Sequence, residues 1–431
     1  MDHREALEHL HALTNYEVIP RAGRIDGLSL DSMQTAMAAL ADPQDSYPVI
    51  HVTGTNGKGS TSRMIEALLM AMGLRVGTYT SPHLESINER IRVGGESIDD
   101  IDLASAITCV AAAAGLLGDP GLTWFETITA AALLHFANEA VDVVVLEVGM
   151  LGRFDATNVA HAQIAVVTNV GLDHTDGSGD WRADIATEKA GIIEPTSVLV
   201  SGETDPDVVS LFERESPASI IERGSDFSVV DDTLAVGGRL IDVRTPRGRY
   251  GEIFLNLHGH HQADNASAAI VAVEEFFDSE LPADVVAEAL GIVTAPGRME
   301  IVGRNPLVML DVAHNPPGAE VLAAALDSTF DDARTIMVLG LLDGRDPRAV
   351  CEALGVANAD LVVTCTAPSR RGVSAADVAR AVDESGGTAE IVEDVTEAVD
   401  RAMSMAFPED MVLIVGSHTV VGEARGHLVK N

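Results

Sequence analysis

The chain has 431 residues, of which 66 are acidic and 28 are lysine or arginine, so its formal charge at neutral pH is −38. A charge of this sign repels the phosphates of nucleic acids and of anionic membrane surfaces, which argues against both as partners. The length exceeds what one hydrophobic core ordinarily holds and predicts two domains.

Three scattered cysteines, Cys109, Cys351 and Cys365, form neither a CxxC metal motif nor a disulfide framework. No basic segment followed by an apolar segment opens the sequence. Apolar runs such as residues 107–118 are shorter than the ~18 residues needed to cross a bilayer. We therefore expect a soluble protein of the reducing cytoplasm.

Lysine is rare in this chain. Only Lys58, Lys189 and Lys430 occur among the 28 basic residues, and all the others are arginine. Acid-rich, lysine-poor chains resemble proteins of salt-loving organisms, whose cytoplasm screens such charge. Where arginine has replaced nearly every lysine, a remaining lysine is a candidate for chemistry that arginine cannot perform. Chance placement is the alternative.

Elements of an α/β domain alternate along residues 1–294. Apolar side chains at helical spacing predict two amphipathic helices within residues 1–40. Near-continuous apolar runs are typical of strands covered on both faces, so we expect a largely parallel sheet. Strands are expected at residues 47–52, 74–81, 141–149 and 163–171, and helices at 58–73, 127–140 and 261–277.

Residues 200–257 depart from this alternation, because irregular strands are separated there by glycine and charged turns. They predict an antiparallel flap. Pro296 and Gly297 are the best candidates for a linker. Beyond it, residues 298–431 predict a smaller Rossmann-like domain. Its strands are expected at residues 306–314, 335–342, 359–366 and 410–417.

The segment TGTNGKGST stands between the first predicted strand and its helix. A loop in this place directs backbone N–H groups and the positive helix end at one point, where phosphate binds well. Lys58 can reach the outer phosphates, and Ser60 or Thr61 can ligate magnesium. The common G-x-x-x-x-G-K-[ST] form is not matched, because Val52 replaces its first glycine and Gly59 follows the lysine. A structural glycine turn is the alternative, but it leaves the lysine without a role.

Glu147 ends the apolar run VVVLE. A second magnesium-binding acid stands at such a strand tip in P-loop enzymes. The alternative is an exposed acid at the end of a strand.

Eight motifs follow one another along the chain: TGTNGKGST, YTSPHL, LEVGMLGRFDATN, LDHTD, EKAGI, HQADNA, PGRME and DVAHNP. Together they resemble the folylpolyglutamate synthase and dihydrofolate synthase family of Mur ligases. The resemblance implies a P-loop parallel-sheet ATPase domain and a Rossmann-like domain. It also implies addition of L-glutamate to dihydropteroate or to the γ-carboxylate of a folate, through an acyl phosphate. A Mur-type ligase of a peptide or polymer precursor and a P-loop ATPase switch are the alternatives.

The resemblance assigns ATP and metal ligands. Residues of the glycine loop and of the domain junction would bind ATP: Gly54, Thr55, Asn56, Gly57, Lys58, Gly59, Ser60, Thr61, Asn265, Arg298, Asp311 and His314. Ser81 and Glu147 would hold one magnesium ion, with Ser60 near the phosphates. His174 and a carbamate on Lys189 would hold a second, and potassium is a further candidate ion. Lys58, Glu147, His174 and Lys189 are thus the expected catalytic residues.

Two of these assignments have alternatives. Lys189 could instead form a salt bridge with Glu188. His174 alone would indicate zinc or copper rather than magnesium, which prefers oxygen ligands.

The acceptor site also follows from the resemblance. Six residues would bind the pterin-linked acid: Pro82, His83, Phe125, Arg153, Asp155 and Ala156. Ser417 and His418 would lie near the incoming glutamate, and a monomer is expected. One departure concerns Leu151, which stands where relatives commonly have glycine and whose Cβ could shift the acceptor loop.

Overall fold

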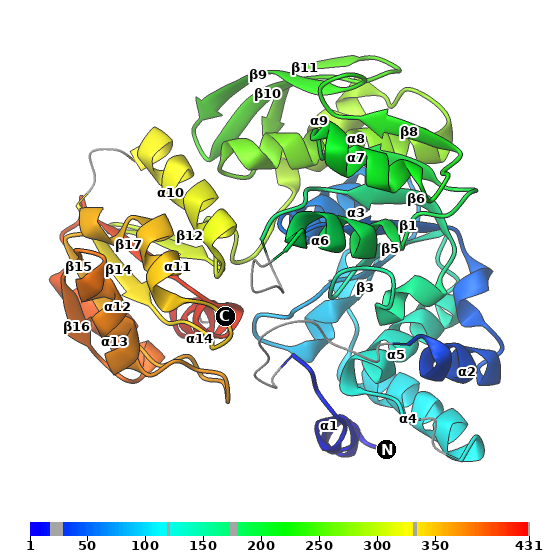
Figure 1. Ribbon diagram of the computed structural model, residues 1–431, viewed down its shortest axis with the longest axis horizontal. Coiled ribbons are helices and arrows are strands. Elements are labelled where there is room, and N and C mark those ends of the chain that lie inside the picture. The colour runs from blue at the N-terminus through cyan, green and yellow to red at the C-terminus, as the bar shows by residue number, and fades with distance from the viewer. Residues whose placement is uncertain (18–28, 119–120, 173–178, 331–333, 430–431) are drawn as a thin grey trace.

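The computed structural model describes residues 1–17, 29–118, 121–172, 179–330 and 334–429. Two sheets, each with helices packed on it, form two parts that lie side by side (Figure 1). The sequence predicted an α/β protein with a larger part followed by a smaller one, and the structure agrees.

The first sheet has eight strands in the order β4-β3-β2-β5-β1-β6-β7-β8. The strands β2, β5, β1, β6, β7 and β8 run parallel to one another. At one side of the sheet, β3 pairs antiparallel with β2 and β4 pairs antiparallel with β3. The sequence patterns missed β3 and β4. The bounds are β1 Val49–Thr53, β2 Val76–Tyr79, β3 Ile91–Val93, β4 Glu96–Ser97, β5 Val143–Glu147, β6 Ala162–Val167, β7 Val198–Ser201 and β8 Ser219–Glu222.

Helices cover both faces of this sheet because alternate side chains of a strand point to opposite sides. In β5, Val143 and Val145 pack with the helices α3 Lys58–Ala71, α8 His260–Phe277 and α9 Ala283–Ile292. Val144 and Leu146 pack with the helices α1 His3–Ala12, α2 Asp31–Ala39, α4 Asp100–Leu116 and α5 Trp124–Asn138. Helices α6 Trp181–Ala190 and α7 Pro206–Glu213 pack against β6 and β7 and form a further buried hydrophobic cluster with them.

The antiparallel segment is shorter than predicted. Strands β9 Ser228–Ala235, β10 Gly238–Arg244 and β11 Arg249–Leu255 form a separate three-stranded sheet. The earlier part of the predicted flap instead supplies β7 and β8, which extend the parallel sheet. The sequence pattern was misleading because an edge strand such as β8 is only half buried and lacks the continuous apolar run of a central strand.

The second sheet has the order β12-β13-β17-β14-β15-β16. Its strands are β12 Glu300–Arg304, β13 Leu307–Asp311, β14 Thr335–Leu339, β15 Leu361–Thr364, β16 Ala389–Ile391 and β17 Met411–Val415. Its helices are α10 Pro316–Phe330, α11 Pro347–Leu354, α12 Ala375–Glu384, α13 Val395–Met405 and α14 His418–Leu428. Strand β12 begins at Glu300, soon after the predicted linker residues Pro296 and Gly297, and pairs antiparallel with β13 at the edge of the sheet.

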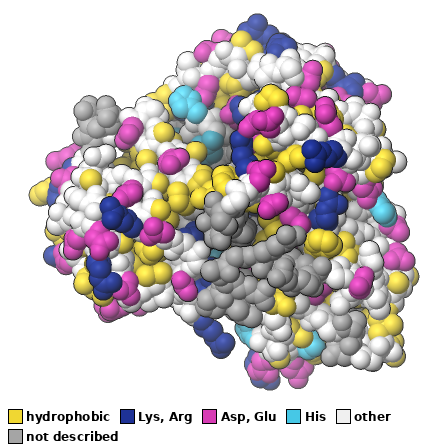
Figure 2. Space-filling view, in the orientation of Figure 1, with side chains coloured by type: hydrophobic (Ala, Val, Ile, Leu, Met, Phe, Trp, Pro, Cys, Tyr) yellow, Lys and Arg dark blue, Asp and Glu magenta, His cyan; other side chains and the backbone are white. Residues whose placement is uncertain are grey.

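Hydrogen bonds join the two parts. Arg371 donates to the backbone carbonyl of Glu17 over 3.0 Å, and Arg425 forms an ion pair with Glu85. No helix within the described ranges is both long and apolar enough to span a membrane. Acidic side chains are scattered over the face in Figure 2, as the composition implies.

Candidate active site

The glycine loop connects β1 to α3. Its backbone conformation leaves no room for a side chain at two of its glycines. Gly54 and Gly57 have φ values of 151° and 84°. A Cβ at Gly54 would lie 1.8 Å from Oγ1 of Thr168, and a Cβ at Gly57 would lie 2.6 Å from Oδ1 of Asn265. The glycines therefore let the backbone lie against its neighbours, and the loop opens onto the N-terminus of α3.

Neighbouring elements hold this loop in place. Oγ1 of Thr168 and Nδ2 of Asn169 both donate to the carbonyl of Asn56, over 2.7 and 2.9 Å. Nε2 of Gln262 donates to Oγ of Ser60 over 3.2 Å, and Nδ2 of Asn265 donates to Gln262 over 3.1 Å. These contacts place Asn265 of α8 beside the loop, as the ATP assignment requires.

Lys58 and Glu147 lie at the same end of the sheet. Nζ of Lys58 donates to the carbonyl of Gly54 over 3.0 Å. Glu147 is 4% exposed and accepts from the backbone N–H of Ser81 over 3.0 Å. Burial raises the pKa of Glu147, while the charges of Lys58, Arg298 and Arg63 oppose that rise. The loop thus lies beside a buried carboxyl with several cations around it.

A pocket between the two parts joins the loop to the second sheet. On one side it is lined by Ser60, Ser81 and Glu147, and on the other by Arg298, His314 and His418. Residues that are far apart in the chain therefore face one space.

Asp311 organises the second side of the pocket. Its carboxylate accepts from the backbone N–H groups of Met299 and Ala313 over 2.9 and 2.7 Å. Burial raises its pKa, and the charge of Arg298 opposes this. The pKa of Arg298 is lowered by burial, which Asp311 and Glu147 partly offset. Nδ1 of His314 donates to the carbonyl of Val312 over 2.8 Å, which orients the ring.

Lys189 lies near the end of α6 and is 4% exposed. The carbonyl of the preceding Glu188 accepts from the backbone N–H of Arg153, which ties α6 to the loop after β5. A Cβ at Gly152 would lie 3.0 Å from the carbonyl oxygen of Lys189, so that loop contacts the helix closely. His174, the other predicted ligand of the second magnesium, lies outside the described residues.

Three of the six predicted acceptor residues, Phe125, Asp155 and Ala156, lie at or against the loop after β5. The ring of Phe125 lies on Gly149, where a Cβ would be 2.3 Å from Cζ of that ring. Phe125 also contacts Tyr79, with ring centroids 6.1 Å apart. Ala156 is buried in the short 3-10 helix Ala156–Val159. An aromatic face and a carboxylate, that of Asp155, are thereby placed close to the strand that carries Glu147.

Asp155 is held by a buried chain of hydrogen bonds. Its Oδ1 accepts from Oγ1 of Thr157 over 2.6 Å, and its Oδ2 accepts from the N–H of Met150 over 2.8 Å. Oγ1 of Thr157 also contacts Nε2 of His51 over 2.8 Å. Since the threonine hydroxyl donates to Asp155, Nε2 of His51 is the donor in the other bond. Burial raises the pKa of Asp155, which these donors oppose.

Leu151 has a backbone conformation that usually favours glycine. Its φ is 61°, in the left-handed region that is costly for a side chain with a Cβ, by roughly 1–2 kcal/mol. Its carbonyl accepts from Oγ1 of Thr53 over 2.7 Å, and its side chain packs beside α6. Whether the acceptor loop differs from that of relatives with glycine here stays a prediction.

The other residues predicted to bind the acceptor or glutamate lie in different surroundings. Arg153 is directed toward Glu215, with which it forms an ion pair. Pro82 is exposed and follows a cis peptide bond, whereas His83 is half-buried and its pKa is lowered to about 4 by burial and by Arg90. Ser417 caps α14, and the adjacent His418 lines the pocket with its pKa lowered to about 4 by burial.

The sequence patterns missed a buried ion pair beside this site. Arg90 is 1% exposed, makes bonds of 2.9 and 2.8 Å to the two carboxylate oxygens of Glu17 and donates to Nδ1 of His83 over 2.8 Å. Its guanidinium also lies 4.7 Å from the ring centroid of Trp124. Burial opposes the charged form of Glu17, but Arg90 holds its pKa below the ordinary value. No motif pointed to this pair, because its partners are 73 residues apart.

Comparison with known proteins decides the family. The Mur ligase middle domain matches residues 52–273, and the Mur ligase glutamate ligase domain matches residues 297–418. A dihydrofolate synthase/folylpolyglutamate synthase of Mycobacterium tuberculosis is 38% identical, over 93% of this chain and 90% of that protein. The chain belongs to this family of Mur ligases.

Solved structures of the family share the whole fold. A folylpolyglutamate synthase of M. tuberculosis complexed with ADP and AMPPCP superposes with a TM-score of 0.92 at 36% identity, covering 100% of both chains. An Escherichia coli homologue in complex with DHPP and ADP gives 0.86 at 31%, covering 98% and 96%. A bifunctional folylpolyglutamate synthase/dihydrofolate synthase with Mn, AMPPNP and L-glutamate bound gives a TM-score of 0.85 at 28% identity, covering 99% of this chain and 98% of that chain.

Proposed function

We propose that this protein is an ATP-dependent ligase that adds L-glutamate to dihydropteroate, to the γ-carboxylate of a folate, or to both. One observation carries the proposal: a single pocket brings Ser60 and Glu147 of the glycine-loop part opposite Arg298 and His314 of the second part. The family's complexes with ADP, with DHPP and with L-glutamate support the same three kinds of substrate.

The reaction requires activation, because a carboxylate has no good leaving group. The acceptor carboxylate oxygen attacks the γ-phosphorus of ATP, the bond to the β-phosphate oxygen breaks, and ADP leaves with that electron pair. The acyl phosphate then reacts with the neutral amine of glutamate, which has lost a proton. The C–N bond forms and the C–O bond to phosphate breaks, so that phosphate leaves with the bonding electrons, and the nitrogen gives up a second proton to phosphate or solvent as the amide results.

The chain's own residues position this transfer and stabilise its charge. Lys58 lies at the glycine loop, where it can pair with the transferring phosphoryl group. Arg298 presents a bidentate donor from the opposite side of the pocket. Phe125 and Asp155 would hold the pterin by stacking and by hydrogen bonding. His418 lies where the incoming glutamate would enter.

The residues present fit a magnesium ion. Ser60, Ser81 and Glu147 line one pocket and supply the oxygen ligands that magnesium prefers. Bound with ATP, the ion would neutralise phosphate charge. Finer expectations belong to the proposal as well: a second magnesium held by His174 and carbamylated Lys189, a potassium ion, and a monomeric, salt-adapted, cytoplasmic enzyme.

Phosphate release tests the proposal. The purified protein in concentrated KCl receives ATP, magnesium, L-glutamate and either dihydropteroate or a reduced folate. We expect phosphate release that requires both glutamate and the pterin acid, with a product whose mass has grown by one glutamyl residue. Release that ignores both substrates would support an ATPase switch, and release with a cell-wall peptide alone would support a peptide ligase.

A further inference from the structure

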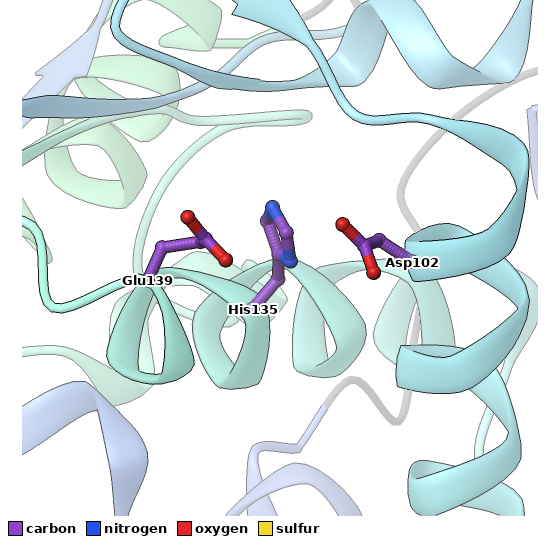
Figure 3. A group of neighbouring side chains, drawn as sticks. All are labelled: Asp102, His135 and Glu139. Atoms are coloured by element: carbon purple, nitrogen blue, oxygen red, sulfur yellow. The ribbon is translucent and has the colours of Figure 1, made fainter.

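A cluster of metal-binding side chains lies away from the pocket, where α4 packs against α5. His135 and Glu139 are one turn apart at the end of α5, and Asp102 lies in the first turn of α4 (Figure 3). One ligand atom from each of the three side chains lies within 4.8 Å of the other two. The ring of His135 stands between the two carboxylates.

His135 is the informative member of this cluster. The residue is only 7% exposed, and no side-chain hydrogen bond is found for its ring among the residues that the structure describes. Burial lowers its pKa even though Glu139 and Asp102 oppose this, which favours the neutral ring. A neutral imidazole is the form that binds metals. The ring of His135 therefore lies between two carboxylates with its nitrogens open to a ligand.

The carboxylates have capacity left for such a ligand. Arg75 pairs with Oε2 of Glu139, which leaves Oε1 available. The side chain of Asp102 is exposed and accepts no hydrogen bond from the residues that the structure describes. Glu139 also caps the C-terminus of α5, where the helix dipole disfavours an anion and favours a cation. A cation bound to Glu139 would offset the unfavourable interaction of its carboxylate with the helix dipole.

We propose that Asp102, His135 and Glu139 bind one divalent transition-metal ion, for which zinc is the probe. An imidazole with two carboxylates suits zinc, with water completing a four-coordinate shell, whereas magnesium and calcium prefer oxygen ligands alone. The ion ties the first turn of α4 to the last turn of α5. The site is separate from the nucleotide pocket, so the proposal does not depend on the function proposed above.

Zinc titration of the metal-free full-length protein tests this site, with bound zinc counted by calorimetry and by elemental analysis. The catalytic pocket can also take up zinc, so the informative quantity is the difference between variants. We expect Asp102→Asn and His135→Gln each to bind one equivalent less than the unsubstituted protein. The matched controls are Asp100→Asn, an exposed acid of the same helical turn, and His161→Gln, whose ring contacts a single carboxylate, that of Glu194.

The controls should bind as many equivalents as the unsubstituted protein. Asp102→Asn changes an exposed side chain and decides the question even where His135→Gln does not fold. Cobalt gives a second readout, because the visible bands of the ion bound through His135 should be missing from the spectra of both variants. Equal zinc stoichiometry and equal cobalt spectra in the unsubstituted protein and Asp102→Asn would overturn the proposal.

Discussion

Replacing Thr157 by valine tests the buried chain that runs from His51 to Asp155. The substitution keeps the shape of the side chain and removes a hydroxyl that donates over 2.6 Å to Asp155 and accepts over 2.8 Å from His51. A hydrogen bond to a charged group contributes about 1.5–3 kcal/mol, and a buried donor left without a partner costs about 1–3 kcal/mol. We expect the free energy of unfolding to fall by roughly 3–5 kcal/mol.

Tryptophan fluorescence during urea unfolding measures this change. Both tryptophans of the chain, Trp124 and Trp181, belong to the first part, so the signal reports on the part that contains the substitution. Thr127→Val is the matched control, because that buried hydroxyl donates over 2.9 Å only to a carbonyl of its own helix. The control should lose about 0.5–1.5 kcal/mol, the usual net value of one neutral hydrogen bond.

A double variant distinguishes the loss of these hydrogen bonds from a general loss of packing. His51→Leu in the Thr157→Val background removes the orphaned donor, so the two losses should be less than additive by about 1–3 kcal/mol. In both variants the KM for dihydropteroate should rise while the KM for ATP stays unchanged, because Asp155 loses its orientation. If Thr157→Val costs no more than Thr127→Val and the double variant is additive, the deduced direction of these hydrogen bonds is wrong.

Four further outcomes follow from the structure. Lys189→Ala should abolish glutamate-dependent phosphate release, and Lys189→Arg should not restore it; an active arginine variant would exclude the carbamate. Gly54→Ala should abolish ATP binding in calorimetry because its Cβ would meet Thr168, whereas Gly73→Ala, with φ of 87° and nothing within 4 Å, should keep binding and lose about 1–2 kcal/mol of stability. Burial lowers the pKa of His51 from 6.5 to about 3, so between these values only the unfolded state binds the proton. Stability should therefore fall as pH decreases, by up to about 1.4 kcal/mol per pH unit, and His51→Leu should lose that dependence in urea titrations at pH 4 to 7. Activity and melting temperature should both rise as KCl screens the charge of −38, and a protein equally stable in dilute buffer would contradict salt adaptation.

Much of the site could be predicted because its groups are local in sequence. The strand, glycine loop and helix around Lys58 form one continuous segment, and the acid of β5 ends an apolar run that is visible in the sequence. The short strands β3, β4, β12 and β16 were missed, because strands at or next to a sheet edge need not be apolar along their length. The ion pair of Arg90 with Glu17 and the contact of His51 with Thr157 had no pattern to reveal them.

The sequence by itself determined which residues could form buried strands, where the backbone needs glycine, and which family the motifs resemble. Only the tertiary structure decided which of these segments lie side by side. Because β1 pairs with both β5 and β6, the glycine loop comes to lie between Glu147 and Thr168, and His51 meets Thr157 across 106 residues of chain. Strand order in a parallel sheet depends on packing between distant segments, which no local pattern of side chains encodes.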